Sequence, residues 1–170
     1  KTIEQRYEAS PREVERMNTQ ELRNDFLVQN LFVWGELNFV YSHYDRMVLG
    51  GAMPNAAGIT LPNYDTLKSE FFLQRRELGI INIGDSGSIT ADGETYKLDK
   101  LSCLYLGKGT KEVSFQSAAA DSPAQFFLFS APAHQSFPNK LFTKEDASPV
   151  TLGATETANR RTIYKYIHDA

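Results

Sequence analysis

From Leu31 onward the sequence consists of short β-branched and aromatic runs, which Gly, Asp, Asn and Pro interrupt at intervals of roughly ten residues. This spacing is typical of an antiparallel sandwich or barrel, because its strands are short and its turns need residues that accept unusual backbone angles. We predict strands at 37–44, 46–50, 70–73, 78–83, 87–91, 94–98, 101–106, 112–117 and 124–131. The chain is therefore expected to be mostly β.

One tight turn and one long loop are predicted within this region. Asp92-Gly93 separates two alternating runs, and this pair supplies the positive backbone torsions that a two-residue hairpin needs. The segment 52–68 contains two prolines and many small polar residues. It is predicted to be a long loop at the rim of the sheets, where loops often carry function.

The first thirty residues carry helix-start signals instead. Ser10 precedes a proline and is followed three residues later by Glu13, and Asn18 is followed at the same spacing by Glu21. After Pro132 the chain becomes irregular, and it finishes in an alternating, strand-like run at 159–167. We therefore predict a helical segment at 1–30, a β-barrel at 31–135, and an irregular linker with a terminal strand at 136–170.

Charge and composition exclude several classes of protein. Eighteen basic and 21 acidic residues give a formal net charge of -3, without the basic block that a phosphate backbone attracts. Nucleic acid is therefore not an expected partner. The charged start does not resemble a secretory signal, and no apolar run reaches the roughly 20 residues that span a bilayer. The single cysteine, Cys103, lies in an apolar run and is expected to pack as a small hydrophobe. A reducing cytoplasm and no membrane contact are expected.

Two groups of residues are candidates for chemistry. His43 and Asp45 lie two apart on a predicted strand and so share a face, and with His134 they could form a two-histidine, one-carboxylate iron site. Ordinary packing explains the same residues, and His168 is expected to be a frayed terminal residue. Arg76 and Glu77 place a guanidinium beside a carboxylate. That guanidinium suits the carboxylate of a sugar acid, and it equally suits a structural ion pair.

The spacing of two further motifs resembles that of metal-binding cupins. Glu77 and Gly84 enclose six residues, as in the second half of the first cupin motif, but no histidine precedes them at the ligand positions. The segment 107–116 keeps the spacing of the second motif, with Glu112 at the place of the ligand histidine. Two carboxylates backed by apolar residues make a poor cage for zinc or iron. We expect a cupin-like antiparallel barrel, or jelly roll, that has no metal site of its own.

Seven segments of the chain form a recognisable series when they are read in order. They are LRNDFLV at 22–28, VYSHYDRMVLGGAMP at 40–54, FFLQRRELGIINIG at 71–84, LYLGKGTKEVSF at 104–115, APAH at 131–134, SPVTLG at 148–153 and NRRTIYKY at 159–166. Together they resemble one family, the 5-keto-4-deoxyuronate isomerases, which are also called 4-deoxy-L-threo-5-hexosulose-uronate ketol-isomerases. The resemblance covers nearly the whole chain.

The resemblance implies a cytoplasmic enzyme of pectin and uronate breakdown. Such an enzyme interconverts 5-keto-4-deoxyuronate and 3-deoxy-D-glycero-2,5-hexodiulosonate. The resemblance also implies a two-barrel subunit, a homo-oligomer that is expected to be a hexamer, and zinc held by histidines and a glutamate in the second barrel. This chain would be the first barrel of that bicupin, and we expect it to be inactive alone.

We therefore assign no catalytic or metal-binding residue in this chain. His43, Arg76 and Glu77 remain candidates for substrate binding at a shared cleft. The alternative hypothesis is a stand-alone, metal-free cupin-like module that binds a sugar acid or serves assembly. An iron-dependent oxygenase using the two histidines and Asp45 is a third possibility.

Overall fold

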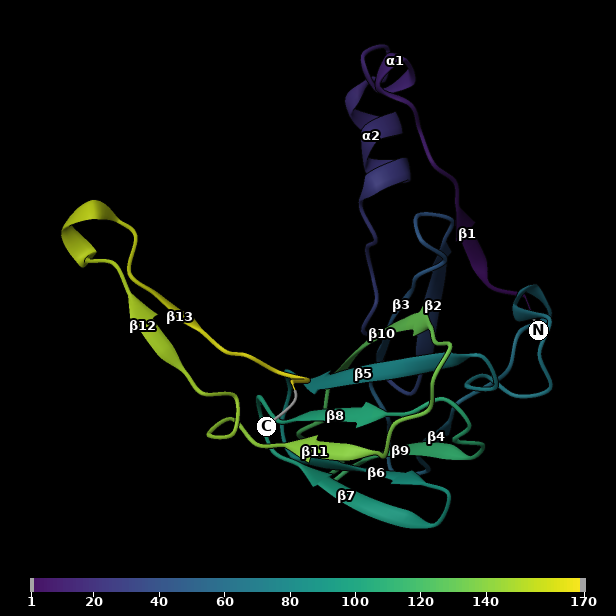
Figure 1. Ribbon diagram of the computed structural model, residues 1–170, viewed down its shortest axis with the longest axis vertical. Helices are drawn as coiled ribbons and strands as arrows, with labels where there is room; N and C mark the ends of the chain where they lie inside the picture. The colour runs from purple at the N-terminus through teal and green to yellow at the C-terminus, as the bar shows by residue number, and fades with distance from the viewer. Residues whose placement is uncertain (1, 169–170) are drawn as a thin grey trace.

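The computed structural model describes residues 2–168 and is mostly β, with short helices only (Figure 1). Its elements in chain order are β1 (Glu4–Arg6), α1 (Pro11–Val14), α2 (Thr19–Phe26), β2 (Leu37–Ser42), β3 (Val48–Ala52), β4 (Ile59–Thr60), η1 (Asp65–Leu67), β5 (Arg76–Asn82), β6 (Gly87–Ala91), β7 (Glu94–Leu98), β8 (Cys103–Leu106), β9 (Val113–Ser117), β10 (Phe126–Pro132), β11 (Lys140–Phe142), β12 (Val150–Leu152), η2 (Thr155–Thr157) and β13 (Arg161–Ile163). No helix within 2–168 is long and apolar enough to cross a membrane.

Two sheets form the body of the molecule. Across the described residues, one sheet has seven strands in the order β1-β2-β3-β10-β5-β8-β11, and the other has four in the order β4-β9-β6-β7. Apart from the parallel pair of β1 and β2, the neighbouring strands in both sheets run antiparallel. The mostly β expectation is confirmed. The pairing within 2–168 does not close the sheets into one barrel, however, so the structure is a two-sheet sandwich.

The core lies between the two sheets and follows from alternation along each strand. Leu78 and Leu128 of the larger sheet and Ile89 and Phe115 of the smaller sheet are all fully buried in one apolar cluster. Burying a side chain of this size stabilises the fold by about 1.5–3 kcal/mol. Because side chains alternate across a strand, every second residue of β5 points away from this core.

Most of the predicted strands are present, and the predicted strand at 70–73 is wrong. Phe72 and Leu73 are 3% and 1% exposed, but the backbone there turns before β5 begins. The Gln74 amide donates to the Phe71 carbonyl (3.2 Å), and the Leu73 carbonyl accepts from the Gly109 amide (2.8 Å). An apolar run can therefore fill the end of a core without joining a ladder.

The Asp92-Gly93 turn is confirmed. It joins β6 to β7, and both residues have positive φ, 47° and 87°. Asp92 also accepts hydrogen bonds from the main-chain amides of Lys111 (3.0 Å) and Glu112 (2.8 Å). The turn thereby holds the loop that precedes β9.

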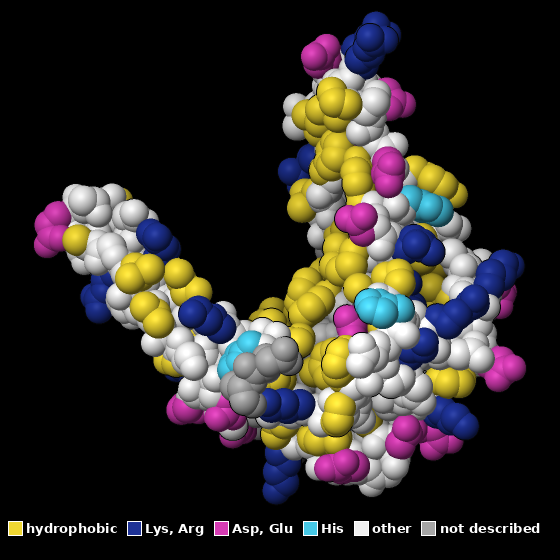
Figure 2. All heavy atoms as spheres, viewed as in Figure 1, with side chains coloured by type: hydrophobic (Ala, Val, Ile, Leu, Met, Phe, Trp, Pro, Cys, Tyr) yellow, Lys and Arg dark blue, Asp and Glu magenta, His cyan; other side chains and the backbone are white. Residues whose placement is uncertain are grey.

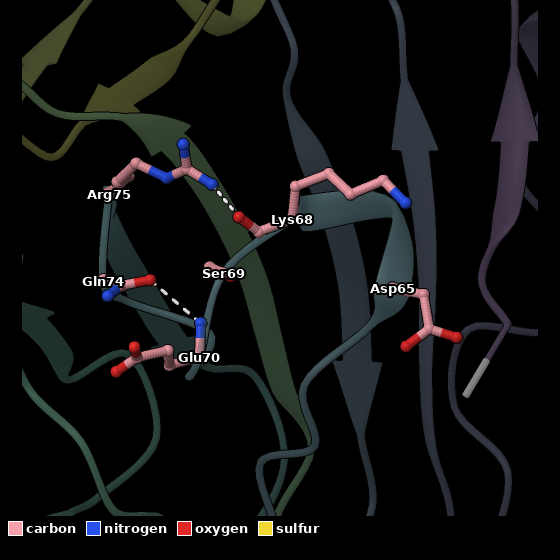
Figure 3. A pocket seen from close by; sticks show the side chains of 6 residues that line it. All are labelled: Asp65, Lys68, Ser69, Glu70, Gln74 and Arg75. Atoms are coloured by element: carbon pink, nitrogen blue, oxygen red, sulfur yellow. Dashed lines mark hydrogen bonds between the residues drawn. The ribbon is translucent and has the colours of Figure 1, made fainter.

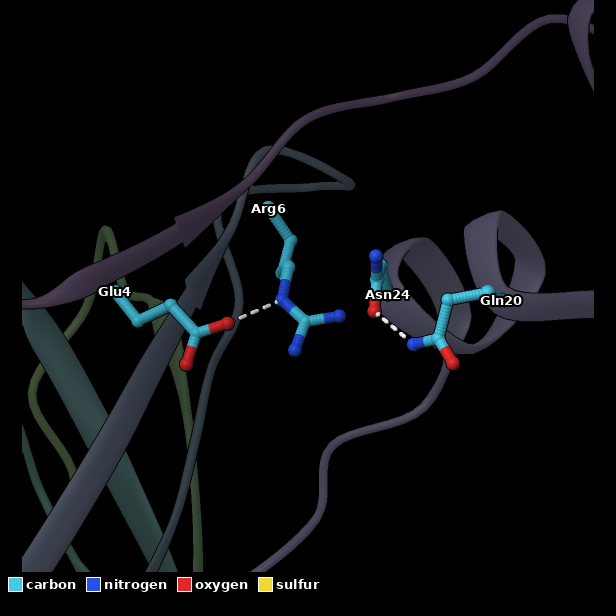
Figure 4. A network of polar contacts seen from close by, with 4 residues as sticks. All are labelled: Glu4, Arg6, Gln20 and Asn24. Atoms are coloured by element: carbon cyan, nitrogen blue, oxygen red, sulfur yellow. Dashed lines mark hydrogen bonds and ion pairs between the residues drawn. The ribbon is translucent and has the colours of Figure 1, made fainter.

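The N-terminal helices form an arm that projects from the body (Figure 1). Both predicted capping boxes are present, with Ser10 and Glu13 at α1 and Asn18 and Glu21 at α2. Figure 4 shows two polar contacts in this part of the chain, where Arg6 pairs with Glu4 on β1 and Gln20 bonds Asn24 on α2. No residue of either helix is buried, so tertiary packing within residues 2–168 stabilises the helices little.

A second arm is formed by the C-terminal hairpin of β12 and β13, which extends from the other side of the body (Figure 1). The predicted terminal strand at 159–167 is shorter in the structure, and its partner is β12, with Val150 opposite Ile163. After the hairpin the chain returns to the body, where the Tyr166 hydroxyl donates to the Leu101 carbonyl (2.5 Å). Apolar side chains, yellow in Figure 2, are visible on both arms and on the body between them.

Candidate functional site

A buried arginine is the first feature of the candidate site. Arg76 begins β5 and is only 6% exposed. Its guanidinium donates from Nε to Ser130 Oγ (3.1 Å), and from Nη2 to the main-chain oxygens of Ser130 (2.9 Å) and Arg46 (2.5 Å). Burial lowers the pKa of Arg76 to about 10, Tyr41 opposes this change, and the like charge of Arg46 adds to it. Neutral acceptors therefore hold Arg76, and no carboxylate within 2–168 forms an ion pair with it.

Arg76 lines a cavity of about 210 Å³ whose charged residues are all basic. The other cations at its wall are Arg46, Lys68 and Arg75. They come from the turn between β2 and β3, from the end of η1 and from the residue before β5. Hydroxyl groups are contributed by Tyr41, Thr66 and Ser69. The cavity is therefore positively charged and offers hydrogen-bond donors from several segments.

A second hollow, of about 720 Å³, adjoins this cavity and shares Lys68, Ser69 and Arg75 with it (Figure 3). The Arg75 guanidinium donates to the Lys68 carbonyl, so this arginine fixes the end of the loop that follows η1. The remaining wall is acidic and amide-bearing, with Asp65, Glu70 and Gln74. The two spaces together present cations in the smaller one and mixed polar groups in the larger one.

Glu77 belongs to a different space, because it follows Arg76 on the strand and points to the opposite face. Its Oε2 accepts a hydrogen bond from the Tyr105 hydroxyl (2.7 Å), and the two residues line a hollow of about 830 Å³ near Lys140 and His168. Burial raises the pKa of Tyr105, and the hydrogen bond and negative charge of Glu77 raise it further. Tyr105 is therefore a hydrogen-bond donor at neutral pH, and it fixes the Glu77 carboxylate.

His43 is positioned by its neighbours in the sheet and in the N-terminal segment. Its ring stacks on Tyr7 at a centroid distance of 4.3 Å, meets Tyr41 edge-on at 5.0 Å, and bonds Gln5 through Nε2 (3.1 Å). Packing therefore accounts for the position of this side chain. The structure does not bring His43, Arg76 and Glu77 into one cavity.

The residues that the structure describes do not fit a zinc or iron centre. No group of three or more His, Cys, Asp and Glu side chains within 2–168 is arranged to hold a metal ion, and this covers the hypothesis of His43, Asp45 and His134. Glu112, which stands at the ligand position of the second motif, is exposed. Cys103 is fully buried, and burial raises its pKa to about 12, which disfavours the reactive thiolate.

The sequence analysis missed the contributions of Arg46, Lys68 and Tyr105. Arg46 and Lys68 both have positive φ, 55° and 49°, so each sits at a tight bend that directs the chain around the cavity. Neither residue lies in a motif with a recognisable chemical spacing. Arg46 and Lys68 meet Arg76 only when the β2–β3 turn, the end of η1 and the start of β5 come together in the folded chain. No signal in the linear sequence indicates this meeting.

Comparisons with known proteins identify the family to which this sequence is similar. Residues 26–170 match the model of the KduI/IolB family. The chain is 48% identical over 166 residues to the 4-deoxy-L-threo-5-hexosulose-uronate ketol-isomerase of Halalkalibacterium halodurans, covering 98% of this chain and 60% of that protein. It is 50% identical over 164 residues to the protein of the same name from Formosa agariphila, covering 96% of this chain and 59% of that protein.

The fold also resembles that of a solved structure. An IolB-like protein from Salmonella typhimurium LT2 matches with a TM-score of 0.51 and 17% identity, over 68% of this chain and 42% of that one. Because the identity is low, this likeness concerns the fold alone. The chain spans about 60% of the length of the curated relatives that it matches. From the family match over residues 26–170 and the identity to these relatives, the chain belongs to the KduI/IolB family.

Proposed function

We propose that this chain is the front, metal-free part of a cytoplasmic 4-deoxy-L-threo-5-hexosulose-uronate ketol-isomerase. The enzyme would interconvert 5-keto-4-deoxyuronate and 3-deoxy-D-glycero-2,5-hexodiulosonate during the breakdown of pectin and other uronates. One observation carries the proposal, which is the 48% and 50% identity, over nearly the whole chain, to proteins with that name. The matched length, 98% and 96% of this chain, includes the sheets and both arms.

The proposal includes a division of labour within the subunit. Moving a proton between adjacent carbons needs a positioned base, and zinc, where it is bound, can stabilise the negative oxygen that develops. The donor sets within 2–168 do not suit zinc, which prefers imidazole nitrogen and thiolate. We therefore assign the zinc and the catalytic residues to the part of the relatives' length that this chain does not cover, as a second barrel of a bicupin.

The two arms support a role in assembly. Large hydrophobic residues are exposed on both of them, including Phe26 (52%) on the first and Val150 and Leu152 (43% each) on the second. Apolar surface that a folded body leaves exposed is typical of protein contacts. In the proposal residues 31–135 form the first cupin-like unit of the subunit, and the flanking segments contact the second unit and other subunits of a homo-oligomer, a hexamer by resemblance.

Of the three candidate substrate contacts, Arg76 has the most suitable surroundings. Arg76 lies in a cation-lined cavity, Glu77 holds a fixed carboxylate in a separate hollow, and His43 is engaged in stacking. A substrate that bridges two barrels can contact separate faces of the first barrel, so we keep all three residues as proposed contacts. Arg76 would meet the uronate carboxylate, and Glu77 would meet hydroxyl groups.

A chimera tests the proposal. This chain replaces the matching portion of the Halalkalibacterium halodurans relative, and ketol-isomerase activity is compared between the chimera, that relative and the 170-residue chain alone. We expect activity in the chimera and none in the chain alone, with bound zinc in the chimera only. Turnover by the chain alone, or a folded zinc-loaded chimera without activity, would contradict the proposal.

The alternative is a stand-alone, metal-free module that binds a sugar acid or serves assembly. The cation-lined cavity favours it, because that cavity is complete within the described residues. Under this alternative the chain binds a sugar acid without converting it, and its insertion into the relative does not restore activity.

A further inference from the structure

We propose that the cavity formed by Arg46, Lys68, Arg75 and Arg76 is a binding site for a small oxyanion, either a phosphate or the carboxylate end of a sugar acid. The proposal concerns binding by this chain, and it holds whether or not the chain belongs to a working isomerase. It rests on how these four cations are partnered in the fold.

None of the four cations forms an ion pair within residues 2–168, and the acidic Asp65 and Glu70 line the adjoining hollow rather than this cavity. The side chains of Arg46 and Lys68 form no hydrogen bond or ion pair within residues 2–168, and no acidic side chain lines the cavity. Like charges gathered in this way repel one another, and Arg46 acts on Arg76 in that direction. An anion in the cavity would remove this repulsion.

Two arginines are held in place by bonds that leave part of each guanidinium available. Arg76 uses Nε and Nη2 for Ser130 and the Arg46 carbonyl, and its Nη1 forms no hydrogen bond within 2–168 although it is not shut off from solvent. Arg75 uses Nη2 for the carbonyls of Leu67 and Lys68. Fixed guanidinium groups bind carboxylate and phosphate well, because their donors are arranged in advance.

The dimensions favour one anionic group. Ligand pockets for drug-sized molecules measure roughly 300–1,000 Å³, and this cavity measures about 210 Å³. The adjoining hollow of about 720 Å³ offers Asp65, Glu70 and Gln74, which are suitable partners for sugar hydroxyl groups. A sugar acid could therefore place its carboxylate among the cations and its hydroxyl groups in the larger hollow.

The test is an NMR titration of the isotope-labelled 170-residue chain at constant ionic strength. The probes are sodium phosphate, sodium D-galacturonate and, as the uncharged control, D-galactose. We expect saturable shifts of the main-chain amides at 66–69 and 75–76 with at least one of the two anions. Saturation by phosphate alone identifies a phosphate site, saturation by galacturonate identifies a sugar-acid site, and either result supports the proposal.

The matched variants avoid the buried arginine. Arg46→Gln and Lys68→Gln change exposed side chains and keep the main-chain oxygens that Arg76 and Arg75 use. Loss of one charged donor should weaken binding about tenfold, and the double variant should lose saturation. Lys97→Gln, an exposed change on β7, should bind like the parent chain. The proposal is overturned by the absence of saturable shifts with both anions, by equal shifts with galactose, or by equal weakening in the Lys97 variant.

Discussion

Asn82 makes four hydrogen bonds in a fully buried position, and its replacement provides a quantitative test of how β5 is anchored. Its Nδ2 donates to the carbonyls of Asp85 (2.8 Å) and Leu98 (2.8 Å). Its Oδ1 accepts from the amides of Gly84 (3.1 Å) and Gln125 (3.3 Å). One side chain thereby links the end of β5 to the loops that precede β6 and β10 and to the end of β7.

The expected loss in Asn82→Ala follows from these partners. A hydrogen bond contributes about 1 kcal/mol net, and a buried group left without a partner loses about 1–3 kcal/mol. Asn82 and Leu98 are both 0% exposed, so water has little access to the position that the side chain leaves. Four hydrogen bonds at about 1 kcal/mol each give about 4 kcal/mol, so we expect a loss of about 3–5 kcal/mol. This is a large part of the roughly 5–15 kcal/mol by which domains are stable.

Urea unfolding followed by circular dichroism measures this loss. The matched control is Asn24→Ala on α2, where the exposed side chain bonds Gln20 one turn away and the expected loss is about 0.5 kcal/mol or less. Asn82→Asp should lose at least as much as Asn82→Ala at pH 7, because a carboxylate would face two carbonyl oxygens. Its pKa would be raised in the folded state, so its deficit should shrink as the pH falls toward about 4. A loss below about 1 kcal/mol in Asn82→Ala would refute this account.

Three further predictions concern single positions. In Gly79→Ala the new Cβ would lie 2.3 Å from Cζ of Phe129, the residue opposite on β10, so we expect the free energy of unfolding in urea to fall by about 1–3 kcal/mol. Adding Phe129→Leu to this variant should recover part of the loss. The Cys103 thiol, whose pKa burial raises to about 12, should resist iodoacetamide at pH 8 in the native chain and react in urea, and rapid alkylation of the native protein would contradict this. Because the pKa of an unfolded thiol is near 8.5, the contribution of Cys103 to stability should decline as the pH rises above that value. Asp92→Ala removes the acceptor for two loop amides at a position with positive φ, and it should destabilise the fold by about 1–3 kcal/mol. Asp92→Asn should destabilise it less, because asparagine keeps an acceptor and tolerates positive φ, and equal losses in the two variants would contradict this account.

Local signals predicted the parts of the fold that depend on neighbouring residues. The capping boxes at Ser10 and Asn18 and the Asp92-Gly93 turn were predictable because each involves residues within a few positions of one another. The strand at 70–73 was wrong because hydrophobic pattern reports burial and not hydrogen bonding. Phe72 and Leu73 are buried without a ladder partner.

The candidate site was predictable only in part. The sequence indicated Arg76 as an arginine that suits an anion. The interpretation of Arg76 and Glu77 as one constellation did not consider that successive strand residues point to opposite faces. The structure places the two side chains in different hollows. It also adds Lys68, which lies outside the seven segments, and Arg46, which lies within the segment at 40–54 but had no chemical role assigned to it.

The sequence by itself determined the β-rich class of the chain, its helix starts, its tightest turn and its resemblance to one family, because all of these are written in short segments or in the order of segments. Tertiary structure alone decided which cations share a cavity, since Arg46, Lys68 and Arg76 meet only when the β2–β3 turn, the end of η1 and the start of β5 are brought together. It also decided that the sheets pair as an open sandwich within 2–168 and that Asn82 is fully satisfied. The physical reason is that hydrogen bonds and charge interactions act over a few ångströms in space, whatever the separation along the chain.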